Sequence, residues 1–129
     1  MNKPAVFIGD PDSAYLDGFK ESNPNVVVHS ANNLRDSQLK IADKSIRFSA
    51  ICVHASMSTP SCLPIIRFIK AHRPATPMYL LFDDEKQIPE KSQFRTLHIQ
   101  DAFQKPIPQN ILMGKLIPSF TFELDKALD

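Results

Sequence analysis

Short runs of branched apolar residues alternate along this chain with segments of helical length. The clearest runs are 5–8 (AVFI), 49–53 (SAICV) and 78–82 (MYLLF), and a shorter one lies at 26–28 (VVV). A run that is apolar at nearly every position is typical of a strand buried on both faces of a parallel sheet. Strands that alternate with helices at this spacing indicate a doubly wound parallel sheet with helices on both faces and right-handed crossovers.

The helical segments between these runs carry recognisable signals at their ends. A first helix is expected over 13–22, where Asp12 or Ser13 supplies a side-chain oxygen to a free backbone N–H group. A later helix is expected to begin at Thr59-Pro60, because proline fits the first helical position. Its buried face follows the i, i+3, i+4, i+7 spacing at Cys62, Ile65, Ile66 and Ile69.

The last third of the chain has weaker signals. The segment 83–100 is polar and poorly periodic, a short fifth strand is expected at 102–104, and a last helix begins near Pro108. The whole pattern predicts a flavodoxin-like (βα)5 fold with a five-stranded parallel sheet. One domain over 1–118 is expected, followed by a tail or linker at 119–129.

Composition excludes several classes of protein. Fifteen basic and fourteen acidic residues in a chain of 129 give a net charge of +1, which argues against nucleic-acid or membrane binding driven by charge. No apolar run approaches the roughly 20 residues of a membrane span, and the start does not resemble a signal peptide. The two cysteines lack zinc-ligand spacing, and the three glycines form no phosphate-binding loop. We therefore expect a cytoplasmic protein without a cofactor.

Several polar residues fall where strands of such a sheet end. Ligand sites in doubly wound sheets lie in the crevice beyond the carboxyl ends of the strands. The residues expected at this edge are Asp10, Pro11, Asp12, His54, Phe82, Asp83 and Lys105.

These residues and their neighbours resemble the receiver domain of bacterial two-component response regulators. The resemblance covers about residues 4–117 and rests on the opening AVFIGDPDS, the segment 49–82 and Lys105-Pro106. In that family the domain phosphorylates itself on an aspartate after the third strand. Two acidic residues help to hold Mg²⁺, and a hydroxyl residue and a lysine contact the phosphoryl group.

This chain departs from the family pattern at most of these positions. Asp10 and Lys105 match it, whereas Pro11 replaces an acid, His54 replaces the phospho-accepting aspartate and Phe82 replaces the hydroxyl residue. Asp12 is expected to begin a helix, and Ala102 stands at the aromatic switch position. An imidazole cannot form an acyl phosphate, and the phenyl ring takes up volume that a phosphate needs. The resemblance therefore implies a pseudo-receiver, which is not an enzyme and acts as a phosphorylation-independent interaction module.

The partner surface implied by the resemblance is formed by the fourth helix, the fifth strand and the fifth helix. We expect it to bind a protein partner or a second copy, and 119–129 to lead to an output domain, with no membrane or direct nucleic-acid contact. The candidate residues are Ile88, Phe94, Leu97, Phe103, Ile111, Leu112 and Lys115. For Ile88, Phe94 and Leu97 two readings stay open: exposed apolar anchors, or side chains that pack inward.

A second hypothesis makes the crevice of Asp10, His54 and Lys105 a ligand- or metal-sensing site. Asp10 and His54, with Asp12 or Asp83, have the donor types of a transition-metal site. The alternative is a neutral His54 hydrogen-bonded to Asp10 or near Lys105, and an ion pair between Lys105 and Asp10.

Overall fold

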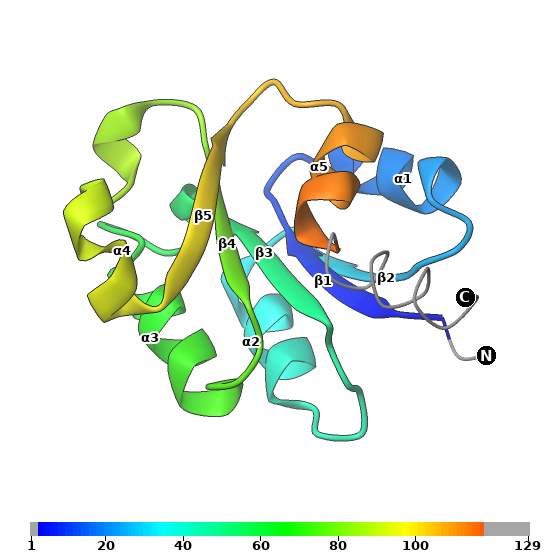
Figure 1. Ribbon diagram of the computed structural model, residues 1–129, viewed down its shortest axis with the longest axis horizontal. Coiled ribbons are helices and arrows are strands. Elements are labelled where there is room, and N and C mark those ends of the chain that lie inside the picture. The colour runs from blue at the N-terminus through cyan, green and yellow to red at the C-terminus, as the bar shows by residue number, and fades with distance from the viewer. Residues whose placement is uncertain (1–2, 118–129) are drawn as a thin grey trace, which may run out of the picture.

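A single parallel sheet organises the computed structural model, which describes residues 3–117. Its strand order is β2-β1-β3-β4-β5, and every neighbouring pair is parallel (Figure 1). This is the order of a doubly wound, flavodoxin-like sheet, so the predicted fold class is confirmed. The strands are β1 (Ala5–Gly9), β2 (Val27–Ala31), β3 (Ala50–His54), β4 (Met78–Phe82) and β5 (Ile99–Gln104).

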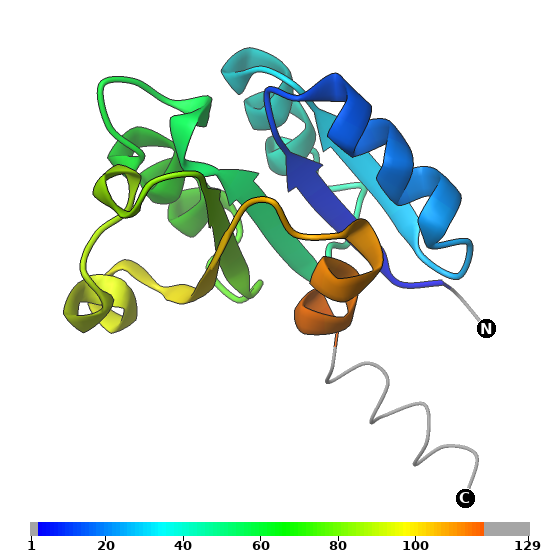
Figure 2. The same ribbon diagram turned by 90° about the horizontal axis from the view of Figure 1, so that it is seen from above.

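Helices cover both faces of the sheet (Figures 1 and 2). The α-helices are α1 (Ser13–Ser22), α2 (Leu34–Ala42), α3 (Leu63–His72), α4 (Lys91–Leu97) and α5 (Gln109–Leu116). Two 3₁₀ turns, η1 (Ala55–Met57) and η2 (Glu85–Gln87), follow β3 and β4. No helix within residues 3–117 has the length and apolar character needed to cross a membrane.

Two core clusters lie on opposite faces of the sheet. The first packs side chains of α2, α3 and α4 on Ile51, Val53 and Leu80. The second packs α1 and α5 on Cys52 and Leu81. Every residue of β3 and β4 is buried, which explains why these strands read as continuous apolar runs in the sequence.

The start of α3 differs from the prediction. The helix begins at Leu63, not at Thr59-Pro60, and the proline of its first turn is Pro64. A turn precedes it, in which the Ser58 hydroxyl donates to the carbonyl oxygen of Ser61 at 2.7 Å. The prediction was wrong because two prolines are compatible with a helix start, and the turn uses the first one.

The segment 83–100 contains η2 and α4, and β5 starts at Ile99 instead of residue 102. This strand is at the edge of the sheet, and Gln100 and Asp101 are exposed. Because these two residues are polar, the first half of the strand lacks the apolar pattern by which a strand is recognised in the sequence.

The expected partner surface is only partly exposed. The prediction that Leu112 belongs to this surface was wrong, because its side chain is 0% exposed and lies in the second cluster. Ile88, Phe94 and Leu97 are half-buried against the first cluster, so the inward reading applies to them. Phe103 is half-buried on the opposite face and stacks on Tyr79. Ile111, which is 50% exposed, and Lys115 do face solvent. The expected tail at 119–129 lies outside the described residues.

Candidate functional site

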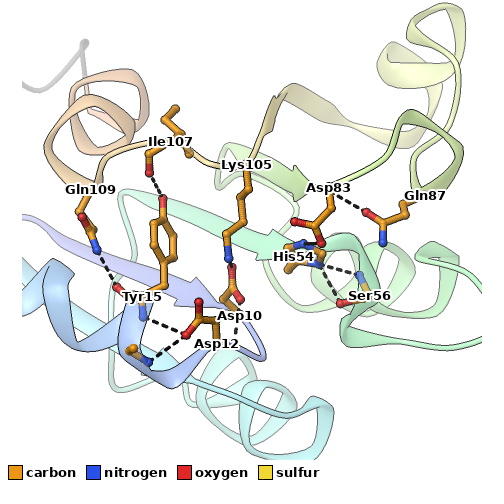
Figure 3. Close-up of polar contacts among 11 residues, drawn as sticks. Asp10, Asp12, Tyr15, His54, Ser56, Asp83, Gln87, Lys105, Ile107 and Gln109 are labelled. Carbon is orange, nitrogen blue, oxygen red and sulfur yellow. Dashed lines mark hydrogen bonds and ion pairs between the residues drawn. The ribbon is translucent and has the colours of Figure 1, made fainter.

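The carboxyl ends of β1, β3 and β4 and the segment after β5 bring the predicted polar residues to one edge of the sheet. They form two separate groups (Figure 3). In one, Lys105 pairs with Asp10; in the other, His54 lies between Asp83 and Ser56.

Asp10 is almost fully buried, at 1% exposure, and both of its carboxylate oxygens are engaged. Oδ2 accepts a hydrogen bond from Lys105 Nζ at 2.9 Å, and Oδ1 accepts from the backbone N–H of Asp12 at 2.9 Å. The Lys105 side chain is itself only 15% exposed. A buried carboxylate is tolerated when an opposite charge and hydrogen bonds replace its lost water, and here both are present. This confirms the expected ion pair.

Tyr15 of α1 packs against the lysine of this ion pair. Lys105 Nζ lies 4.4 Å from the centre of the Tyr15 ring, a favourable cation–π distance. The Tyr15 hydroxyl donates to the carbonyl oxygen of Ile107 at 2.7 Å, which ties α1 to the segment between β5 and α5. In the sequence, Tyr15 stands four residues before Phe19, a spacing typical of an apolar helix face, and nothing there indicates its contact with Lys105.

His54 is 3% exposed and has a partner on each ring nitrogen. Nδ1 accepts the backbone N–H of Ser56 at 3.1 Å and lies 2.8 Å from the Ser56 hydroxyl. Nε2 is 3.0 Å from Oδ2 of Asp83, whose side chain is 61% exposed. A backbone N–H can only donate, so Nδ1 is the unprotonated nitrogen and Nε2 carries the proton towards Asp83. The arrangement describes a neutral imidazole that caps η1.

The partners of His54 differ from those expected. Asp83 and Ser56 hold the ring, whereas Asp10 is occupied by Lys105. Ser56 was not predicted as a partner of His54. A hydrogen bond from a backbone N–H to the side chain two residues earlier is nevertheless common in turns. Asp12 behaves as predicted: its carboxylate accepts from the N–H groups of Ala14 and Tyr15 and caps α1. Pro11 is exposed beside it.

Phe82 is buried in the first core cluster. Side chains two residues apart in a strand lie on the same face of the sheet. The Phe82 side chain therefore lies on the face of Met78 and Leu80, whereas that of His54 lies on the face of Cys52, on the other side of the sheet. The ring therefore packs towards α4, where it lines a cavity together with Ala102. Our expectation that the ring takes up space in the crevice did not account for this alternation.

The crevice does not fit a bound cation. Within residues 3–117, no three His, Cys, Asp or Glu side chains are arranged to hold a metal ion, so Asp10, His54 and Asp83 do not form the expected set. Mg²⁺ prefers oxygen ligands, but both Asp10 oxygens are taken, Pro11 offers none in its side chain and His54 offers nitrogen.

Comparison with known proteins finds similarity in structure alone. No protein-family profile matches the chain, and no curated protein matches its sequence. Solved structures do match. A CheY-like response regulator receiver domain protein from Methanospirillum hungatei superposes with a TM-score of 0.75 at 14% identity, covering 97% of this chain and 99% of that one.

Two further structures show the same similarity. A structure described as adenylate cyclase from Rhodopirellula baltica gives a TM-score of 0.77 at 14% identity and covers 98% of both chains. The response regulator DrrB of Thermotoga maritima, an OmpR/PhoB homolog, gives 0.71 at 20% identity, covering 95% of this chain but 54% of that one. At these identities the comparisons show the fold: the chain has the receiver-domain fold of CheY-like response regulators.

Proposed function

We propose that this chain is a pseudo-receiver, a signalling module that binds a protein partner without being phosphorylated. One observation carries the proposal: in the crevice that holds a phosphoryl group in receivers, the polar side chains already pair with other groups of this chain. His54 stands at the end of β3, and Lys105 neutralises the buried Asp10 at 2.9 Å. Neither group is free to react.

Chemistry supports this reading. Phosphoryl transfer to an aspartate requires an ionised carboxylate, and position 54 carries an imidazole whose two nitrogens are engaged. A magnesium ion entering the crevice must displace the Lys105 ammonium and the Asp12 N–H from Asp10. Both exchanges cost interactions that the resting protein already makes.

The partner surface in this proposal is the face made by α4, β5 and α5. Ile111 and Lys115 are exposed on α5, and Phe103 is half-buried on β5. β5 is also an edge strand, so its outer side offers backbone groups that no other strand pairs with among the described residues. The occupant is a protein partner or a second copy, with an output domain after residues 119–129, and we place the module in the cytoplasm.

A titration followed by amide NMR tests the proposal. We expect spectra that stay unchanged on adding Mg²⁺ and then beryllofluoride, a phosphoryl mimic, while size-exclusion chromatography shows the same assembly throughout. As a positive control, the triple variant Pro11→Asp, His54→Asp and Phe82→Thr restores the family pattern and should gain shifts. Wild-type shifts that spread to residues 85–116 would overturn the proposal. Shifts confined to Asp10, His54 and Lys105 would favour the ligand-sensing hypothesis instead.

A further inference from the structure

A cavity of about 320 Å³ lies between η2, α4 and β5, apart from the crevice. α4 packs beside β5, the strand at the edge of the sheet (Figure 1). The apolar walls of the cavity come from Phe82, Ile88, Pro89, Phe94 and Ala102.

The cavity exists because a small side chain stands between large ones. Ala102 of β5 pairs with Leu80 and faces the first core cluster, so it contributes only a methyl group to this side of the sheet. Phe82 closes the cavity from β4, while Ile88 and Phe94 are half-buried at its sides. The result is a cavity with apolar walls that opens to solvent beside the sheet.

Charged side chains border this hollow unequally. Glu85, Glu90 and Lys91 line it. Within residues 3–117, the carboxylates of Glu85 and Glu90 make no hydrogen bond or ion pair. The nearby acids are engaged, since Asp83 pairs with His54 and Asp84 accepts from the N–H of Lys86. Lys91 also borders a second hollow with Arg95 and His98, which contains no acidic residue. The open carboxylates therefore give the apolar cavity an acidic rim.

We propose that this cavity receives one aromatic or branched aliphatic side chain of a protein partner, flanked in the partner's sequence by lysine or arginine. The volume is at the lower end of small-molecule pockets, which span roughly 300–1,000 Å³, and suits a single anchor side chain. Interface hot spots are typically such anchors in apolar pockets. The basic neighbours of the anchor pair with Glu85 and Glu90. The inference rests on the proposed interaction function and names the chemistry of its partner.

Peptide selection against the 129-residue chain tests this inference. Random twelve-residue peptides on phage should enrich sequences with an aromatic or aliphatic residue next to lysine or arginine. For an enriched peptide, fluorescence anisotropy should show at least about tenfold weaker binding to Ala102→Leu and Ala102→Phe, which fill the cavity. Glu85→Lys and Glu90→Lys should each weaken binding about fivefold at low salt and less at high salt.

Two substitutions outside the cavity serve as matched controls. Val27→Phe enlarges an exposed side chain at the opposite edge of the sheet, and Glu21→Lys reverses a charge on the exposed face of α1. Neither should change peptide affinity. Thermal melts establish that each variant is folded; if Ala102→Phe unfolds, the comparison rests on Ala102→Leu.

The outcomes separate this inference from the proposed function. The inference would be overturned if selection yields no peptide, acidic peptides, or peptides that bind Ala102→Leu with wild-type affinity. None of these results would contradict the proposed function, which the magnesium titration tests separately. A dimer in analytical ultracentrifugation that Ala102→Leu converts to monomer, without peptide binding, would assign the cavity to a second copy and also overturn it. A beryllofluoride response would overturn phosphorylation independence even where peptide binding in the cavity persists.

Discussion

At the scale of single residues, the carboxylate of Asp10 is a buried charge held by two hydrogen bonds. Among residues 3–117, the one cationic side chain paired with it is Lys105, at 2.9 Å, and neither group has much access to water. Removing one partner of such a pair leaves the other charge buried without compensation, which typically costs 3–5 kcal/mol.

We expect Lys105→Met to lower the free energy of unfolding by about 3 kcal/mol, measured by urea denaturation at neutral pH. Asp10→Asn should cost less, because Lys105 can extend towards solvent and the amide oxygen still accepts from Asp12. The double variant should be more stable than the sum of the two single effects predicts, with a coupling of about 2 kcal/mol. Additive effects would show that the two side chains do not stabilise each other.

Single residues also show where sequence reasoning reached the site and where it stopped. The cap by Asp12 and the Lys105–Asp10 pair were predictable, because strand ends of a parallel sheet meet at one edge and opposite charges there attract. The partner of His54 was not, because it depends on how η1 turns Ser56 back onto the ring. The face of the sheet on which Phe82 lies could have been predicted, because side chains alternate along a strand and Phe82 stands two residues after Leu80.

At the scale of elements, one arginine joins the end of α3 to the end of α2 and to the segment between α2 and β3. Arg73 donates to the carbonyl oxygens of Ile41 and Ile46, each at 2.7 Å, and also to that of Asp43. Its guanidinium group lies 4.8 Å from the centre of the Phe48 ring. The sequence showed Arg73 only as the end of a helix before a proline, since its carbonyl partners are far away along the chain.

We expect Arg73→Lys to destabilise the protein by about 2 kcal/mol, because an ammonium group cannot satisfy three divergent carbonyls and does not stack on the ring as a flat fork does. Hydrogen exchange should show faster opening of residues 43–49 in the variant. Arg67→Lys, on the exposed face of the same helix, is the matched control and should change stability by less than about 0.5 kcal/mol. Equal effects of the two substitutions would contradict the anchoring role of Arg73.

Elements differ in how far the sequence determines them. β3 and β4 were predictable because they are buried on both faces and leave no polar interruption. α4 and β5 were not: α4 has seven residues, none of them fully buried, and β5 is a polar edge strand. The same weakness of pattern left the burial of Ile88 and Phe94 undecided by the sequence. For Phe94 it depends on which side of a short helix meets the sheet, and for Ile88 on how the chain turns between η2 and α4.

At the scale of the whole molecule, the second core cluster couples protonation to folding. Cys52 and Tyr79 are buried in it, and Tyr15 packs at its edge. Burial is the main cause that raises the pKa of all three groups above their ordinary values, and nearby negative charge adds to it, from Asp10 at Cys52 and Tyr15 and from Asp101 at Tyr79. The native state therefore holds protons that the unfolded chain releases in alkali.

The sign of the resulting pH dependence follows directly. Below pH 9.0, the ordinary pKa of a thiol, both states keep the Cys52 proton and stability does not depend on it. Above that pH the unfolded chain loses the proton while the native state retains it, so rising pH favours unfolding by about 1.4 kcal/mol per pH unit for one group. Above pH 10.0 the two tyrosines add to the slope.

Cys52→Val, which keeps an apolar side chain of similar size, should flatten the fall in unfolding free energy between pH 9 and 10 relative to wild type, measured by urea denaturation at each pH. Parallel curves for the two proteins over that interval would show that Cys52 releases its proton as readily in the native state as in the unfolded chain.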